Sequence, residues 1–475
     1  MKKIILVITI TYCLLLLPAC SSDKQKEIIE DGDLSYQMDL SFDPKEHTIS
    51  GTETVIIRNT SDDAWDQLSF RDYPSDKRFQ KKINSGITEI SDISIVYPSG
   101  KKAKGTCERD EEDATILFFG LDQELKPGEL IKLSFNFCTY IPKNDDRFGY
   151  SKNSHCLGYF FPILSVYEEG DWINHPTFKM GECAYTECAE FDVKLEVPEG
   201  YMVITTGEAL PDEELTFHAE KVRDFTIVIG NNYEVASADW NGIEINSYYI
   251  RGNEEGGKKI LEAAIDSLEA YSEAIGPYPY ASIDYAETSF EGGALGMEYP
   301  QLVMIMEGLE SFDQKNGSDL TRLVTAHETA HQWFYGIIGN DQYAEAWIDE
   351  GFATYLENVF YEHIGELTFE DLIRRNALPV TFSDNQKLGG EALDQSYSDF
   401  TNSNTYANTV YTRGGNFLIA LREIMGDEDF NSAVREIYER YQFEEVNTEQ
   451  ILDLFKNHTK KDLNGIYGYY FLLKP

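Results

Sequence analysis

The sequence predicts an α+β protein of two domains, in which an N-terminal all-β saddle or sandwich is followed by a largely helical domain. Three observations predict it. The chain of 475 residues is too long for one ordinary hydrophobic core. Short segments of alternating polar and apolar residues fill its first half, and the apolar spacing becomes helical after about residue 248.

The first twenty residues have the layout of a bacterial lipoprotein signal. Two lysines precede a mostly apolar run over residues 4–17, which is too short for a comfortable membrane span. The stretch LPAC at residues 17–20 then resembles a lipobox, so residues 1–20 are predicted to be the signal and Cys20 the lipidated residue. We expect the body to lie outside the cytoplasm and to touch a membrane only through this anchor. Plain secretion is the alternative.

Charge restricts the possible partners. The chain has 40 Lys and Arg against 83 Asp and Glu, a formal net charge of -43. Such a surface repels nucleic acid and anionic lipid headgroups, so nucleic acid is not an expected partner. Five cysteines remain besides Cys13 and Cys20, without the close spacing of a zinc ribbon, and their pairing is left open.

Residues 21–238 are predicted to form the β domain. Its first strand shows the pattern most clearly, because four apolar residues alternate there with polar ones: Tyr36, Met38, Leu40 and Phe42. Further short strands are expected at residues 52–57, 131–137, 191–197, 201–205 and 225–229. Many short strands separated by Gly, Pro, Asn and Asp favour a sandwich or an open saddle over a βαβ domain.

Residues 239–475 are predicted to form the second domain. Its first helix is indicated by apolar residues at helical spacing: Ile260, Ala263, Ala264, Leu268 and Tyr271. Strand-like segments flank residues 291–293, and beyond Ser318 the chain is predicted to be mostly helical.

One helix of this domain carries the motif HETAH at residues 327–331. Ser318 is the expected N-cap, and the helix is expected to end near Gly336 or Gly339. His327 and His331 are four residues apart, so both rings can reach one metal ion. Glu328 points to a different side of the helix, where it can reach a water molecule on that metal.

A catalytic zinc ion needs a third protein ligand and an open fourth position. Glu350 follows His331 after eighteen residues, at the start of another predicted helix, and can complete the set. A closed structural site would need a further His or Cys and would gain nothing from Glu328. The pattern therefore predicts one catalytic Zn²⁺ held by His327, His331 and Glu350.

The motifs HETAH and WIDEGFA, with Glu350 inside the second, resemble those of the aminopeptidase N family of zinc metallopeptidases, the gluzincins. Two more stretches support this resemblance: GGALGMEY at residues 292–299 and VYTRGG at residues 410–415. It implies a thermolysin-like catalytic domain packed against the β domain. The C-terminal helical domain of longer members is expected to be absent.

The resemblance also implies roles for further residues. Glu328 is the expected general base, and Tyr411 the expected stabiliser of the oxyanion, with Tyr406 as its nearby competitor. Glu298 would bind the free α-amine of the substrate. The backbone around it would lie along the substrate, through four residues: Gly293, Ala294, Gly296 and Met297.

The predicted function is therefore a zinc-dependent aminopeptidase that hydrolyses the N-terminal bonds of extracellular peptides. A zinc endopeptidase or a peptidase of relaxed polarity is the alternative within the same chemistry, favoured if Glu298 binds no amine. A non-catalytic peptide-binding lipoprotein on the same fold is the alternative from another class. The loss of Glu328 or of a zinc ligand would indicate it, and all four of these residues are present.

Overall fold

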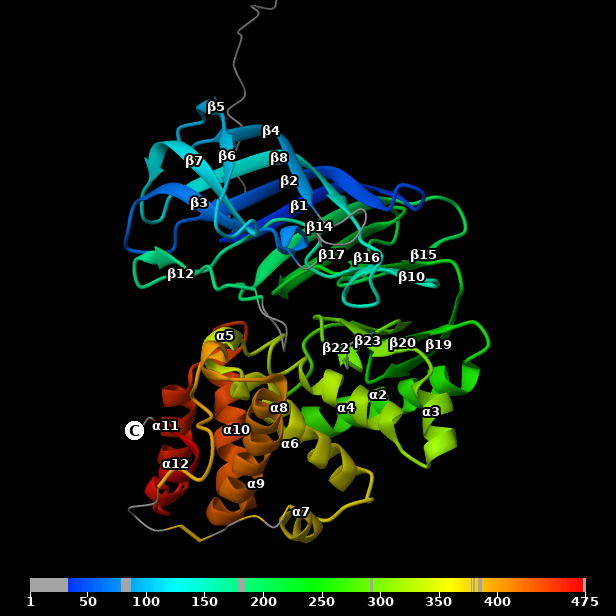
Figure 1. The fold of residues 1–475 in the computed structure, drawn as a ribbon, viewed down its shortest axis with the longest axis vertical. Helices are drawn as coiled ribbons and strands as arrows, with labels where there is room; N and C mark the ends of the chain where they lie inside the picture. Colours follow the sequence, from blue (N-terminus) through cyan, green and yellow to red (C-terminus); the bar gives the residue numbers. More distant parts are fainter. Residues whose placement is uncertain are drawn as a thin grey trace, which may run out of the picture.

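A computed structural model of the chain describes residues 33–77, 87–177, 184–290, 294–376, 378, 381–382 and 387–472. The predicted signal segment with Cys20, and also Gly293, lie outside these described residues. The β-rich half occupies the top of Figure 1 and the helical half the bottom. The predicted fold class, α+β with an all-β domain first, is confirmed.

The largest sheet of the β-rich half has eight strands. In sheet order they are β16 (Glu208–Ala209), β17 (Thr216–Val222), β14 (Ala189–Glu196), β1 (Leu34–Asp43), β2 (Thr48–Arg58), β8 (Leu130–Tyr140), β4 (Thr88–Val96) and β5 (Lys102–Lys104). Neighbours pair antiparallel except β1 with β14. The alternation predicted in β1 is confirmed, because its four apolar residues are buried and the residues between them are exposed.

Smaller sheets complete this half. One contains β15 (Met202–Thr205), β18 (Ile227–Gly230), β10 (Ser154–Leu157) and β9 (Phe148–Tyr150). A second contains β11 (Ile163–Leu164), β3 (Trp65–Arg71), β7 (Ile116–Leu125) and β6 (Thr106–Arg109), and β12 (Tyr167–Glu168) pairs with β13 (Asp171–Trp172). A 3₁₀ turn, η1 (Tyr73–Ser75), follows β3. The inner faces of these sheets share one aromatic-rich core.

A five-stranded sheet lies between the two halves. Its order is β19 (Tyr233–Trp240), β20 (Ile243–Ile250), β21 (Ser282–Thr288), β23 (Leu302–Met306) and β22 (Gly296–Met297). Along β23, Leu302 and Met304 join the core of the β-rich half, whereas Val303 and Ile305 join the helical core. The predicted boundary between the two domains, after residue 238, lies inside strand β19. This strand pairs with β20 along its whole length and so belongs to the five-stranded sheet.

The helices pack below this sheet (Figure 1). They are α2 (Glu254–Ala274), α3 (Leu309–Asn316), α4 (Leu320–Ala330), α5 (Gln342–Glu345), α6 (Trp347–His363), α7 (Phe369–Arg375), α8 (Ser403–Ala407), α9 (Gly414–Met425), α10 (Asp427–Tyr441), α11 (Thr448–His458) and α12 (Asn464–Tyr470). A 3₁₀ turn, η2 (Tyr397–Asp399), precedes α8, and one π-helical segment, η3 (Asn408–Arg413), precedes α9. All five apolar residues used to predict the first helix are buried in α2.

Side chains also join the two halves directly. His175 of the β-rich half lies 2.8 Å from a carboxylate oxygen of Asp341 and stacks on Tyr343, with ring centroids 4.4 Å apart. Among the described residues, no helix combines the length and the apolar character that a membrane crossing requires.

Candidate metal and active site

Helix α4 carries the first predicted ligand and the predicted base. His327 lies near its end, and His331 is the first residue beyond it, so the helix is shorter than the sequence predicted. The chain continues from His331 in wider turns, in which the amides of Gly336 and Ile337 donate to the carbonyls of His331 and Gln332. The four-residue spacing still brings the two Nε2 atoms to 3.2 Å from each other.

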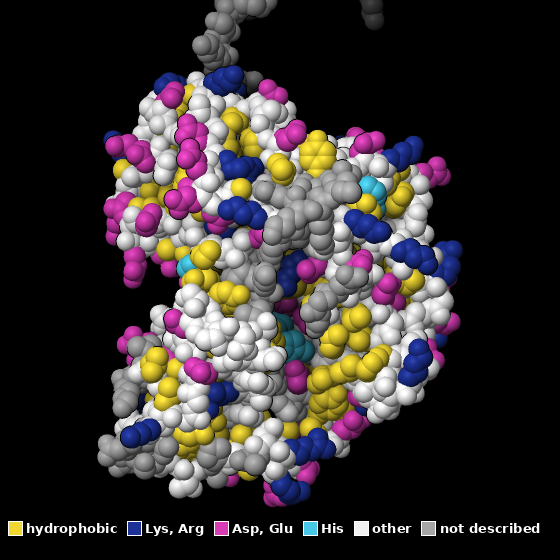
Figure 2. Space-filling view, in the orientation of Figure 1, with side chains coloured by type: hydrophobic (Ala, Val, Ile, Leu, Met, Phe, Trp, Pro, Cys, Tyr) yellow, Lys and Arg dark blue, Asp and Glu magenta, His cyan; other side chains and the backbone are white. Residues whose placement is uncertain are grey.

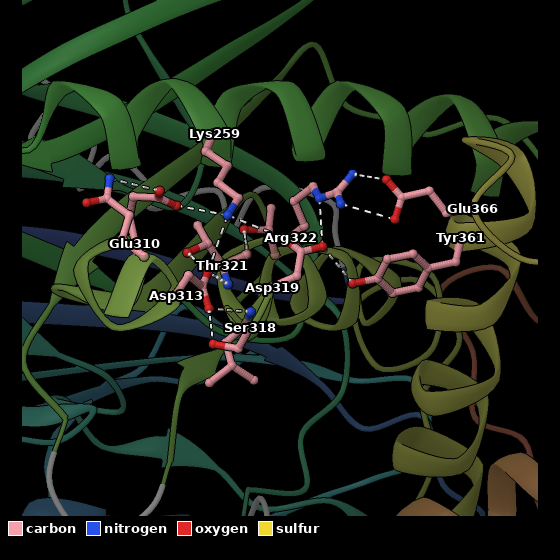
Figure 3. Close-up of polar contacts among 12 residues, drawn as sticks. Lys259, Glu310, Asp313, Ser318, Asp319, Thr321, Arg322, Tyr361 and Glu366 are labelled. Carbon is pink, nitrogen blue, oxygen red and sulfur yellow. Dashed lines mark hydrogen bonds and ion pairs between the residues drawn. The ribbon is translucent and has the colours of Figure 1, made fainter. Parts of the chain in front are cut away.

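The start of α4 also differs from the prediction. Ser318 is not the cap; its hydroxyl donates to the Asp313 carboxylate at 2.7 Å (Figure 3). Asp313, inside α3, accepts from the amides of Leu320 and Thr321 at 2.8 and 2.9 Å, and Lys259 of α2 lies 3.3 Å from the same carboxylate. The cap therefore comes from a preceding helix, which pattern reading over a few residues does not find.

Helix α6 brings Glu350 to the two histidines. A carboxylate oxygen of Glu350 lies 3.3 Å from Nε2 of His327 and 3.5 Å from Nε2 of His331. A tetrahedral zinc ion with bonds of about 2.0–2.1 Å would hold its ligand atoms about 3.4 Å apart. The three donor atoms thus already form one face of a zinc coordination tetrahedron.

The other ring nitrogens explain why both Nε2 atoms serve as donors. Nδ1 of His327 lies 2.7 Å from the Glu357 carboxylate. Nδ1 of His331 is in close contact with the Asp349 carboxylate and lies 3.2 Å from the carbonyl oxygen of Phe334. Acceptors at Nδ1 keep the proton there and leave the Nε2 lone pair for a metal.

Three electron-pair donors within 3.5 Å of one another repel each other unless a cation lies among them. Burial lowers the pKa of His327, but hydrogen bonds to Glu350 and Glu357 outweigh it and raise that pKa to about 10. Burial raises the pKa of Glu350, but its bonds to His327 and His331 outweigh it and lower that pKa to about 2. The surrounding carboxylates favour positive charge at this point, and the donor set fits the predicted zinc ion.

Glu328 lies beside the backbone of β22. A Cβ atom on Gly296 would stand 2.5 Å from a carboxylate oxygen of Glu328, so only glycine permits this approach. The side chain of Glu328 is buried, and burial raises its pKa, which the nearby His327 and His331 partly oppose. A carboxylate with a raised pKa is suited to accepting and returning a proton near neutral pH.

Glu298 follows β22 directly and is 5% exposed. Oxygen and nitrogen atoms of Glu298, His331 and Asp349 lie within 4.8 Å of one another. The backbone at this point is tied to the residue after the HETAH motif, because the Gln332 side chain contacts the carbonyls of Glu298 and Tyr299 at 3.3 and 3.1 Å. The structure therefore places Glu298 beside one predicted metal ligand, His331.

The other predicted substrate-binding residues lie on the same segment. Gly296 and Met297 form β22 and pair antiparallel with Ile305 and Met304 of β23. Ala294, two residues earlier, is half-buried against the β-rich core.

Tyr411 reaches the site from η3. Its hydroxyl donates a hydrogen bond to the Glu350 carboxylate, and its ring stacks beside His327 with centroids 5.9 Å apart. Tyr406 is buried one layer behind, with its ring 6.4 Å from that of Tyr411. The Tyr411 hydroxyl therefore contacts a predicted metal ligand, as expected for the tyrosine preferred from the sequence.

Sequence reasoning missed three functional residues: Asp349, Glu357 and Gln332. Asp349 and Glu357 hold the two histidine rings, and Gln332 holds the loop of Glu298. A signal existed for Glu357, since it lies seven residues after Glu350 on the same face of α6. No pattern in the sequence predicts the contact between Gln332 and residue 298, because the two segments come together only in the folded protein.

Figure 2 shows a hollow between the β-rich and helical halves, in which histidine and acidic side chains are exposed. The fold and this site define a two-domain protein with an HExxH metal centre of the zinc type. Residues 260–470 match the model of the peptidase family M1 domain. The chain therefore carries a peptidase family M1 domain, which confirms the resemblance drawn from the motifs.

Curated relatives agree with this assignment. Aminopeptidase M1-B of Oryza sativa subsp. japonica is 22% identical over 92% of this chain and 48% of its own length. Aminopeptidase M1-D of the same plant is 25% identical over 59% of this chain and 35% of its own length. The chain thus spans about half of the length of these relatives, or less.

Solved structures show the same fold. The M1 zinc metallopeptidase from Deinococcus radiodurans superposes with a TM-score of 0.63 at 20% identity, covering 90% of this chain and 91% of that one. A mutant of that enzyme bound to a Tyr-Ser-Ala substrate gives a TM-score of 0.62 at 18% identity, covering 93% and 96%.

Proposed function

We propose that this chain is a zinc-dependent aminopeptidase. The observation that carries the proposal is the placement of the Glu298 carboxylate within 4.8 Å of the metal-ligand His331. The α-nitrogen of a residue lies about 2.5 Å from its own carbonyl carbon. A carboxylate beside a metal-ligand histidine is placed to bind an amine about one residue away from the bond that is cut.

Different residues of the chain would carry out different parts of the hydrolysis. Zinc held by His327, His331 and Glu350 would polarise the substrate carbonyl and acidify a water molecule. Glu328 takes the proton of that water and returns it to the leaving amine. The Tyr411 hydroxyl donates to the oxygen that becomes negative as the bond is attacked.

Substrate alignment comes from β22 and Glu298. Among the described strands β22 lies at the edge of the five-stranded sheet, where an extended peptide can add to it. Glu298 then pairs with the free α-amine. Peptide substrates are consistent with the Tyr-Ser-Ala substrate bound in the mutant of the structural neighbour.

Matched fluorogenic peptides with free and acetylated N-termini test the proposal, together with the zinc content of the protein. We expect one zinc per chain and cleavage of the free peptide only. Glu298→Gln should lose most of this discrimination, because its uncharged amide attracts an ammonium group less strongly. Preference for the acetylated peptide would instead identify an endopeptidase.

The proposed location is the outer surface of a bacterial membrane, through a lipid on Cys20. The lipobox-like residues 17–20 support it. Expression of the full chain in a bacterium followed by detergent phase separation tests it. The wild type should enter the detergent phase and Cys20→Ser the aqueous phase. Recovery of the wild type in the aqueous phase would point to plain secretion.

A further inference from the structure

Tyr335 has an unusual backbone conformation four residues after the metal-ligand His331. Its φ of 116° is one that residues with a Cβ rarely adopt, so the backbone is strained at this residue. The preceding carbonyl, that of Phe334, lies 3.2 Å from Nδ1 of His331. Because φ of Tyr335 sets the orientation of the peptide group between residues 334 and 335, it also sets the direction of this carbonyl.

The β-rich half holds Tyr335 at both ends. Nε of Arg223 donates to the Tyr335 carbonyl at 2.7 Å. The Asp224 carboxylate accepts a hydrogen bond from the Tyr335 hydroxyl. The Tyr159 hydroxyl lies 3.3 Å from the same Tyr335 hydroxyl. Arg223 and Asp224 directly follow β17, so consecutive residues of the β-rich half fix the main chain and the side chain of one tyrosine.

Arg223 is itself held rigidly. Its guanidinium donates to the carbonyls of Thr186 and Glu444, each at 2.9 Å, and pairs with the Glu445 carboxylate. It also fits closely against the chain after Tyr335, because a Cβ on Gly339 would stand 2.1 Å from its central carbon. The guanidinium is 3% exposed, so water does not compete for these bonds.

We propose that Arg223 and Asp224 are positioning residues of the metal site. They hold Tyr335 in its strained conformation, and Tyr335 directs the Phe334 carbonyl at Nδ1 of His331. The β-rich half thereby helps to set the tautomer and orientation of one zinc ligand. The inference rests on the proposed zinc site and is independent of peptidase turnover.

The test compares Tyr335→Phe, Arg223→Lys and the control Tyr280→Phe in the full chain. Tyr335→Phe removes the bond to Asp224, and Arg223→Lys removes the Nε donor to the Tyr335 carbonyl. The Tyr280 hydroxyl makes an equivalent bond between the two halves, to the Lys221 carbonyl at 2.9 Å, and this bond involves neither Tyr335 nor Phe334. The measurements are the zinc dissociation constant by chelator competition and the visible absorption spectrum of the cobalt form.

We expect Tyr335→Phe and Arg223→Lys each to raise the zinc dissociation constant about tenfold and to change the cobalt spectrum. The increase stays near the low end of such effects because Asp349 still contacts His331. Tyr280→Phe should leave both measurements unchanged. A merely structural role would lower the melting temperature of all three variants without moving affinity or spectrum. Wild-type zinc affinity and spectrum in folded Tyr335→Phe would overturn the proposal, whether or not the wild type cleaves peptides.

Discussion

Gly351 and Gly414 lie in direct backbone contact where α6 meets the start of α9. A Cβ on Gly414 would stand 2.8 Å from Cα of Gly351, and a Cβ on Gly351 would stand 3.1 Å from Cα of Gly414. Glu350 precedes the first glycine and Tyr411 lies three residues before the second. The close crossing therefore lets the Tyr411 hydroxyl reach the Glu350 carboxylate.

Gly414→Ala should separate the two segments and move Tyr411 away from Glu350. We expect kcat/KM to fall about 10- to 100-fold while the zinc content is retained, with a loss of about 1–3 kcal/mol in the free energy of unfolding from overpacking. Asn416→Ala, at a half-buried position of the same helix, is the control and should change kcat/KM less than threefold. Unchanged kcat/KM in Gly414→Ala would mean that this crossing does not set the position of Tyr411.

Glu328→Gln should keep the metal and lose turnover. The amide matches the carboxylate in size, so the contact with Gly296 is preserved, but it cannot accept the proton of the attacking water. We expect kcat to fall by about 10²–10⁴-fold at full zinc occupancy, measured by metal analysis of the assayed sample. His331→Ala, in contrast, should lose the zinc. Substantial turnover in zinc-loaded Glu328→Gln would remove Glu328 from the role of base.

Tyr411→Phe and Tyr406→Phe separate the two tyrosines near the site. Tyr411→Phe removes the hydroxyl next to the metal ligands, and we expect kcat to fall about 10²–10³-fold with little change in KM, as for the loss of one oxyanion donor. Tyr406 packs behind it, so Tyr406→Phe should reduce kcat less than tenfold. If only the Tyr406 variant loses activity, the assignment of Tyr411 is wrong.

Asp313→Asn should weaken the start of α4 in a pH-dependent way. Burial raises the pKa of Asp313, but hydrogen bonds from Thr321, Ser318 and Leu320 outweigh it and hold that pKa well below its ordinary value. The charged carboxylate therefore stabilises the fold above its unfolded pKa of about 3.9, and this contribution is lost as the pH falls through the lower folded value. At pH 6 we expect the variant to be about 2 kcal/mol less stable by urea unfolding.

The difference between wild type and Asp313→Asn should shrink as the pH falls below about 4. Glu366→Gln is the control in the same polar cluster (Figure 3). Glu366 is 48% exposed and pairs with Arg322, and this pair should contribute less than about 1 kcal/mol. If the loss of stability caused by Asp313→Asn is equally large at pH 3 and pH 6, the charged Asp313 carboxylate does not cap α4.

The motif residues were predictable because their spacing is a property of one helix. His327 and His331 lie one turn apart in any helical structure of this sequence, and Glu350 needed only a second helix to reach them. The early end of α4 was not predictable, since the wide turns after His331 form in a segment whose residues bond to partners distant in sequence. Arg223 donates to the Tyr335 carbonyl, and the Gln301 amide donates to the Gln332 side chain. The capping of α4 by Asp313 was not predictable for the same reason, because Asp313 lies in the preceding helix α3.

The sequence by itself predicted the two-part fold class, the three metal donors and the expected base, because local periodicity and fixed spacing encode them. The tertiary structure decided which tyrosine contacts Glu350, which carboxylates hold the histidine rings, and how close Glu298 lies to the metal site. Each of these depends on contacts between distant segments, such as Gly351 on Gly414 or Gln332 on the carbonyl of Glu298. Such crossings arise from packing between residues far apart in the chain, which no local pattern records.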